Sequence, residues 1–167
     1  LTANSFTRTG YDFSGWATSE GGEKVYDDEA SYTMGTSSEY TLYAVWTAIE
    51  YSITYDLDEG ENDQRNPLSY TIEDEFSLSN PSKAGYTFDG WYESDLETPA
   101  DTTIDEGTIG ALAFYAVWKA NINTLKFDAN GGEGDMADMA IATDSEVNLT
   151  TNNLTRTGYD FSGWETN

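Results

Sequence analysis

The side chains in this chain best suited to bind an ion lie in two acidic segments. The first runs Asp-Leu-Asp-Glu-Gly-Glu-Asn-Asp over residues 56–63, and the second runs Asp-Ala-Asn-Gly-Gly-Glu-Gly-Asp over residues 128–135. Calcium prefers about six to eight oxygen ligands, which carboxylates and amides supply. The candidate calcium ligands are therefore Asp56, Asp58, Glu59, Asp128, Asn130 and Asp135.

Both segments also have a simpler interpretation as turns. In the first, Gly60 stands where an EF-hand loop needs its third ligand. The second is close to the calcium-binding Gly-Gly-x-Gly-x-Asp repeat, but it occurs once rather than in series. Hairpin turns with solvated carboxylates would give the same pattern. A shorter acidic run at residues 27–29 indicates only an exposed loop.

The composition argues against catalysis. The chain has no His and no Cys, so the commonest general base and the thiol nucleophile are both missing. The 31 acidic residues make carboxylate pairs so frequent that no single pair stands out. We predict that the protein is not an enzyme and uses no cofactor other than calcium.

Two modification sites are conceivable from local sequence. Asn148-Leu-Thr and Asn153-Leu-Thr match the N-glycosylation pattern, which also arises often by chance. A Lys–Asn crosslink would need a buried lysine, and Lys126 alternates with Leu125 and Phe127, which places it on the outward face of a strand.

Charge limits the possible partners. A formal net charge of −24 repels nucleic acid and anionic membranes. The sequence contains no apolar run long enough to span a membrane, and its first residues do not resemble a signal peptide. Its 5 Trp, 12 Tyr and 7 Phe distinguish it from disordered acidic segments, so we expect a folded protein.

Internal repetition organises the whole chain. The phrase Gly-Tyr-x-Phe-x-Gly-Trp occurs at residues 10–16, 85–91 and 158–164, and Tyr-Ala-Val-Trp follows the first two copies at residues 43–46 and 115–118. The copies recur every 72 to 75 residues, which is the size of a small domain rather than of a solenoid unit.

The repeat predicts three parts: the second half of a repeat at 1–46, a complete repeat at 47–118, and the first half of another at 119–167. Residues 1–19 match residues 149–167 at 14 of 19 positions, so the chain spans two periods. It is either a segment of a longer array at an arbitrary phase, or a unit whose halves complete each other between molecules.

Strand patterns dominate the remaining sequence. Residues 52–57 and 124–129 alternate apolar and polar side chains, as half-buried strands do. Further strands are expected at 67–72, 75–78 and 86–92, and the dense apolar run at 112–118 predicts a central strand covered on both faces. Residues 135–142 are the best helix candidate, although they are short enough to be a turn. The expected fold class is β-rich, either all-β or α+β with little helix.

The motif Gly-Tyr-x-Phe-x-Gly-Trp is best explained by the packing of its aromatic side chains in the core of each repeat. Its glycine before Trp would allow a β-bulge, and its first glycine would take a positive φ. A platform of exposed aromatics that stacks on glycans is the alternative. The expected core of the middle repeat consists of Ile53, Tyr55, Tyr86, Phe88, Trp91, Tyr115, Val117 and Trp118.

These paired motifs, with the strand and turn Leu-Lys-Phe-Asp-Ala-Asn-Gly-Gly at residues 125–132, resemble the Listeria–Bacteroides repeat family, which includes the B-repeat of Listeria internalins. The resemblance covers the whole chain. It implies tandem β-grasp-like domains of about 73 residues on bacterial or archaeal surface proteins, with no catalytic residues. The middle copy departs from the pattern at residues 58–62 and 103–111, which are loop regions.

Three functions follow from this resemblance and from the composition. The first is a structural module of an extracellular or cell-surface protein, acting as a stalk or spacer, with neighbouring repeats as its partners. The second is head-to-tail self-assembly into a filament through exposed strand edges. The third is adhesion to a host protein or glycan.

Trp91 tests the core interpretation. If its side chain is buried, Trp91→Ala should lower the free energy of unfolding by roughly 3–5 kcal/mol, since a large cavity replaces the indole. Thermal unfolding followed by circular dichroism measures this effect. An unchanged melting temperature would instead favour the glycan platform.

Overall fold

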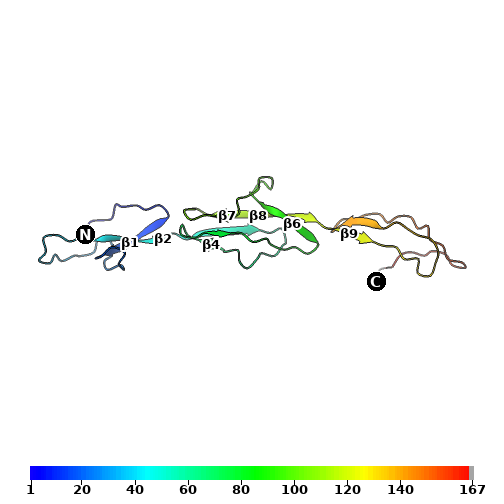
Figure 1. Cartoon of the computed structure of the whole chain (residues 1–167), viewed down its shortest axis with the longest axis horizontal. Helices are drawn as coiled ribbons and strands as arrows, with labels where there is room; N and C mark the ends of the chain where they lie inside the picture. The colour runs from blue at the N-terminus through cyan, green and yellow to red at the C-terminus, as the bar shows by residue number, and fades with distance from the viewer. Residues whose placement is uncertain (166–167) are drawn as a thin grey trace.

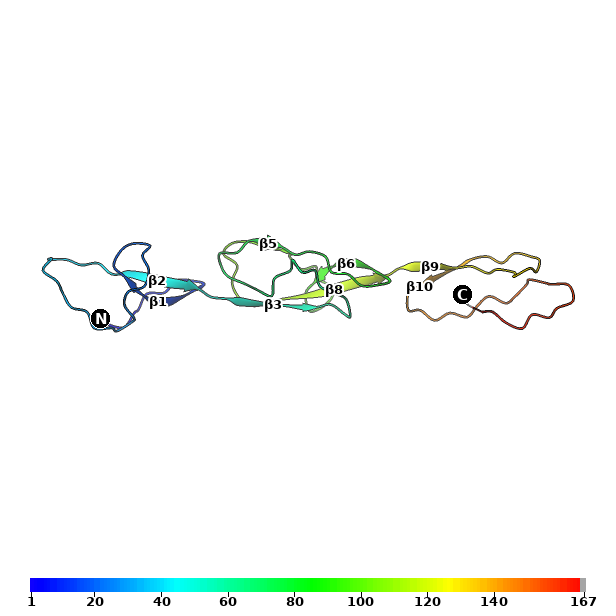
Figure 2. The ribbon, with the colours of Figure 1, turned by 90° about the horizontal axis from the view of Figure 1, so that it is seen from below.

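The structure is a computed structural model in which residues 1–165 are described. Within these residues it contains ten β-strands and no helix. The strands form three groups in a row along one long axis, and the two views of Figures 1 and 2 show the same arrangement. The β-rich fold class is therefore confirmed.

The strands follow one another with short connections between the groups. Strand β2 ends at Ala48 and β3 begins at Tyr51, while β8 ends at Ala120 and β9 begins at Ile122. The bounds are β1 Tyr11–Ala17, β2 Tyr43–Ala48, β3 Tyr51–Asp56, β4 Ser69–Tyr70, β5 Phe76–Ser77, β6 Tyr86–Tyr92, β7 Thr103–Ile104, β8 Leu112–Ala120, β9 Ile122–Leu125 and β10 Met139–Ala142.

The middle group contains a four-stranded sheet in the order β4-β3-β8-β6. The first and last long strands of the group, β3 and β8, lie side by side in its centre and run parallel, with Ile53 opposite Leu112. The flanking strands β4 and β6 are antiparallel to their neighbours. A small second sheet, β5 with β7, completes the group.

The outer groups each contain one antiparallel pair, β1 with β2 and β9 with β10. The β1–β2 pair repeats the pairing of β6 with β8: Trp16 lies opposite Ala44 as Trp91 lies opposite Ala116. The β9–β10 pair similarly repeats the pairing of β3 with β4. The sequence repeat is thus also a repeat of strand pairing.

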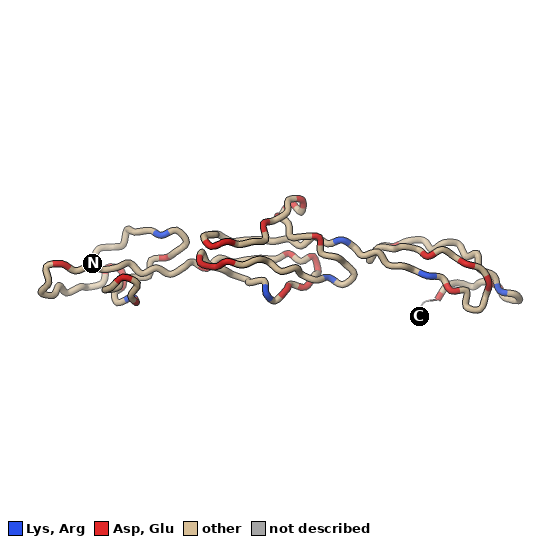
Figure 3. The backbone as a smooth tube through the Cα atoms, viewed as in Figure 1, with Lys and Arg blue, Asp and Glu red and all other residues tan. Residues whose placement is uncertain are grey.

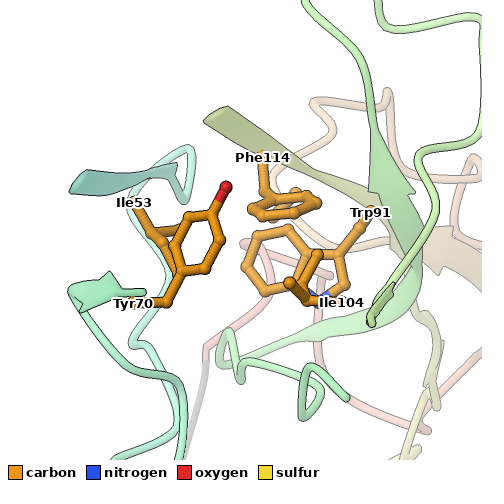
Figure 4. Close-up of a cluster of buried hydrophobic side chains, with 6 residues drawn as sticks. Ile53, Tyr70, Trp91, Ile104 and Phe114 are labelled. Atoms are coloured by element: carbon orange, nitrogen blue, oxygen red, sulfur yellow. The ribbon is translucent and has the colours of Figure 1, made fainter. Parts of the chain in front are cut away.

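A single aromatic cluster forms the core of the middle group. Figure 4 shows Phe114 and Trp91 facing Tyr70 and Ile53, with Ile104 from β7 beside the indole. These side chains are all 5% exposed or less. Tyr55, Phe88 and Trp118 pack against the cluster and are partly buried. The prediction of these three, and of Ile53 and Trp91, as core residues is confirmed.

The prediction of Tyr86, Tyr115 and Val117 as core residues is wrong. The core face of β8 carries Phe114 and Ala116, so Tyr115 and Val117 lie on the opposite face and are only partly covered. Side chains alternate along a strand, so an error of one position moves a residue to the other face. The same pattern corrects the expectation that both faces of this strand are covered, because Ala113 and Lys119 are exposed.

The expected details of the motif are present. The strand register shifts between Phe88 and Gly90, and equally between Phe13 and Gly15, as a β-bulge does. The first glycine of each copy has a positive φ, between 76° and 80°. The bulge lets Phe88 and Trp91 face the same core although they are three residues apart.

The expectation of a helix near residues 135–142 is wrong, since strand β10 occupies Met139–Ala142. The apolar residues Met139 and Ile141 face the same side, two residues apart, as a strand requires.

Phe114 and its neighbour Tyr115 provide a matched test of the strand's orientation. Phe114→Ala should lower the free energy of unfolding by roughly 3–5 kcal/mol, since it empties the centre of the core. Tyr115→Ala removes a similar volume from the other face and should cost clearly less. Urea unfolding measures both, and equal losses would contradict the assigned face.

Candidate functional site

The aromatic side chains of the repeated motif pack against the tryptophan of the Tyr-Ala-Val-Trp segment in the first two copies. In the middle copy, Phe88 packs edge-on against Trp91 at 5.4 Å and against Trp118 at 5.3 Å between ring centroids. In the first copy, Phe13 makes the same contacts with Trp16 at 5.0 Å and Trp46 at 5.6 Å. Edge-to-face packing of this kind is favourable beyond the area that it buries. The motif and the Tyr-Ala-Val-Trp segment therefore act together.

Trp118 also fastens the last strand to the first turn of its repeat. Its indole N–H donates to the carbonyl of Leu57 at 2.9 Å. Gly60 lies beneath the indole, and a Cβ added there would come within 2.6 Å of the Trp118 ring. The turn therefore needs glycine at this position because the indole approaches it so closely.

One buried amide joins the two halves of the middle repeat. The Asn66 side chain is 6% exposed and accepts a hydrogen bond from the Ser79 backbone N–H at 2.7 Å. It also donates to the Ser79 carbonyl at 3.0 Å and to Asn62 at 2.7 Å. The same carbonyl accepts from the Trp91 indole N–H at 3.3 Å. Asn66, which the sequence analysis missed, thus fixes the peptide that orients the core tryptophan.

The predicted calcium ligands lie in two equivalent turns. Asp58 and Glu59 have positive φ values of 44° and 65°, and Asn130 and Gly131 have 45° and 80°. Gly60 N–H donates to the Leu57 carbonyl at 2.8 Å, and Gly132 N–H to the Ala129 carbonyl at 2.9 Å. Both segments therefore form tight turns with two left-handed residues, the type that joins antiparallel strands.

Several of the predicted ligand side chains have hydrogen-bond or ionic partners. Asp56 accepts a hydrogen bond from the Asp58 backbone N–H at 3.2 Å, and Asp128 accepts from the Asn130 N–H at 2.7 Å. The Asp58 carboxylate is 3.0 Å from the Lys83 ammonium. Asp135 and Glu59 are exposed.

Across residues 1–165, no group of three or more acidic side chains is arranged to hold a metal ion. Asp56, Asp58 and Glu59 do line one open hollow of about 440 Å³ beside Tyr55, and Asp128 and Asn130 share a turn in the other segment. Calcium binding stays a prediction, as does glycosylation at Asn148 and Asn153, both of which are exposed. Lys126 points outward as expected, with 78% of its side chain exposed.

Acidic residues are spread along all three groups of strands, and basic residues are few (Figure 3). No helix within residues 1–165 is long and apolar enough to cross a membrane.

The repeated strand pairing and aromatic closure define a tandem β-repeat protein. The chain belongs to the Listeria–Bacteroides repeat domain family, whose profile matches residues 1–45, 51–117 and 124–167. The resemblance drawn from the motifs is thus confirmed. No solved structure matches the chain.

Three relatives illustrate where such repeats occur. A predicted membrane protein of Evansella cellulosilytica is 32% identical over 95% of this chain, and a predicted glycine-rich membrane protein of the same organism is 31% identical over 77%. Internalin H of Listeria monocytogenes is 30% identical over 70%. The matched region spans only 24%, 15% and 21% of these proteins, respectively.

We expect ionisation of Tyr55 to lower the stability of the protein at high pH. Its hydroxyl donates to the Pro67 carbonyl at 2.8 Å, and burial raises the pKa of Tyr55 from 10.0 to about 12. The folded protein buries this phenol in its uncharged form, whereas the unfolded chain can ionise it more easily. The resulting contribution to the free energy of unfolding is therefore present in full below about pH 10 and is lost as the pH rises through about 12.

Urea unfolding between pH 9 and pH 12 measures the effect, with Tyr55→Phe as the comparison. The variant should lose less stability over this range than the parent chain, because it has no phenol to ionise at this position. Parallel pH profiles would contradict the assignment.

Proposed function

We propose that this chain is part of a non-catalytic stalk or spacer in a protein at the surface of a bacterial or archaeal cell. The observation that carries the proposal is the parallel pairing of β3 with β8. Because the first and last strands of the repeat run in the same direction, the chain enters at one end of the repeat and leaves at the other. Successive repeats then extend the molecule instead of folding back.

The relatives and the charge support the same proposal. Two relatives are predicted membrane proteins and a third is an internalin, and the region that matches this chain is about a quarter or less of each of them. A net charge of −24 spread along the molecule would keep neighbouring stalks apart and soluble.

We also propose that residues 47–118 form one folding unit related to the β-grasp fold, flanked by partial units at 1–46 and 119–167. The sheet order β4-β3-β8-β6, with a parallel central pair, is the order of a β-grasp sheet in which loops and the small β5–β7 sheet replace the helix.

Self-assembly is the second candidate. Among residues 1–165, β2 pairs with β1 alone, whereas β8 pairs on both edges, with β6 and β3. Phe161 is 51% exposed although the equivalent Phe88 packs in a core. A second copy could supply the missing strand, because an open edge is a template for another chain.

Light scattering across protein concentration, with and without calcium, separates these functions. A spacer should keep a constant molar mass of 18.5 kDa. A mass that grows with concentration, and that falls back in the variant Phe161→Glu, would favour the filament instead. A change in molar mass caused by calcium alone would support the predicted ion site.

A further inference from the structure

The Gly-Tyr pair that opens the first two motifs lies where two repeats meet. Tyr86 at the start of β6 donates its hydroxyl to Asp144 of the following group at 2.8 Å. One period earlier, Tyr11 donates to Glu73 at 2.8 Å. Glu73 and Asp144 occupy the same place, in the turn after the second strand of their repeats.

The glycines of the two pairs face the same turns. A Cβ added to Gly85 would come within 2.6 Å of Thr143 Cγ2, and a Cβ added to Gly10 would come within 2.5 Å of Ile72 Cδ1. Both glycines have positive φ values, 80° and 76°. The backbone is therefore in close contact with the next repeat at a position that favours glycine on two grounds.

Backbone hydrogen bonds hold the connecting residue at each boundary. Asn121 N–H donates to the Gly85 carbonyl, and Ile49 N–H donates to the Gly10 carbonyl, both at 2.9 Å. At the second boundary Thr143 N–H also donates to the Asn121 carbonyl at 2.8 Å. The connection is thus bonded to the repeat before it and, at the second boundary, also to the repeat after it.

A basic residue three positions before each tyrosine orients its ring. Arg8, Lys83 and Arg156 lie 3.7, 4.6 and 4.3 Å from the ring centroids of Tyr11, Tyr86 and Tyr159. These are three of only seven basic residues in the chain. Cation–π contacts of this kind are attractive, and they are present in all three copies.

The third copy shows the same surface uncovered. Tyr159 is 67% exposed, and no atom lies within 4 Å of a Cβ added to Gly158, although its φ is also 80°. In the first two copies, by contrast, the turn of the following group contacts both the glycine and the tyrosine.

We propose that the Gly-Tyr pair of each motif is a docking surface for the following repeat of the array, and that it fixes the angle between successive repeats. Its partner is the turn at residues 71–74 or 143–145, which offers a small aliphatic side chain to the glycine and a carboxylate to the tyrosine. This inference concerns the geometry of the array and does not depend on its role as a stalk.

A distance measurement across the second boundary tests the proposal. The chain has no cysteine, so Glu97→Cys and Ala137→Cys, both at exposed positions, would carry the only two spin labels. Pulsed electron spin resonance should give one narrow distance distribution for this labelled chain. Gly85→Ala should shift and broaden it, because the new methyl group collides with Thr143.

Two variants control for strain within the backbone. Gly107→Ala also places alanine at a positive φ, between the two labels but with no atom near the new methyl group, so it should leave the distribution unchanged. Gly85→Ala combined with Thr143→Ser removes the colliding methyl group and keeps the hydroxyl, so it should restore the narrow distribution. An unchanged distribution in Gly85→Ala, or no restoration in the double variant, would overturn the proposal.

Tyr86→Phe provides an independent measurement if Gly85→Ala does not fold. It removes only the hydroxyl that reaches Asp144, and it should broaden the same distribution while the circular dichroism spectrum stays unchanged. Tyr159→Phe is the matched control and should have no effect. Equal distributions in the two phenylalanine variants would count against the docking surface.

Discussion

The parallel pairing of β3 with β8 is the constraint on which the rest of the middle repeat depends. These strands are joined by a long excursion that contains β4 to β7, so their pairing brings together segments far apart in the sequence. Closing such a connection costs conformational entropy, which local contacts alone cannot offset. The aromatic cluster supplies the compensation, because Ile53 of β3, Phe114 of β8 and Trp91 of β6 all bury their side chains against one another. Because of the same pairing, the chain leaves the repeat at the end opposite to the one where it enters. The connections between neighbouring groups are short, with two residues between β2 and β3 and one between β8 and β9.

Polar contacts also hold distant segments of the middle group together. In the middle repeat, Asn66 of the first half holds the Ser79 peptide of the second, and that peptide accepts the Trp91 indole N–H. The first group of strands repeats only the pairing of β6 with β8. There the equivalent Trp16 has a buried indole nitrogen with no acceptor among the described residues. A buried donor without a partner is costly, which shows what the Ser79 carbonyl contributes to Trp91 in the middle group.

The sequence predicted the period, most strands, the bulge before Trp91 and the positive φ of the motif glycines, because these depend on local residue patterns. It did not predict the face of β8. The run from Leu112 to Trp118 is apolar at every position, so the alternation that normally identifies the buried face is absent. It also wrongly placed Tyr86 in the core, because the residue pattern of one motif does not show whether its tyrosine is covered by its own repeat or by the next one. Composition also cannot separate two roles of the acidic turns: Asp56 and Asp128 accept backbone hydrogen bonds in tight turns, and calcium binding by these segments stays a prediction.

The motif therefore divides into two parts with different tasks. Its Phe, second Gly and Trp serve the core of their own repeat, whereas its opening Gly-Tyr faces outward along the array. Joining both tasks within seven residues couples them mechanically: β6 begins at Tyr86 and carries Trp91 five residues later, so the strand that is anchored in the core also presents the tyrosine to the next repeat. A short strand with both ends fixed transmits orientation far better than a flexible linker would. The docking role that we propose accounts for the recurrence of the whole phrase, and not only of its core aromatics, in the three copies.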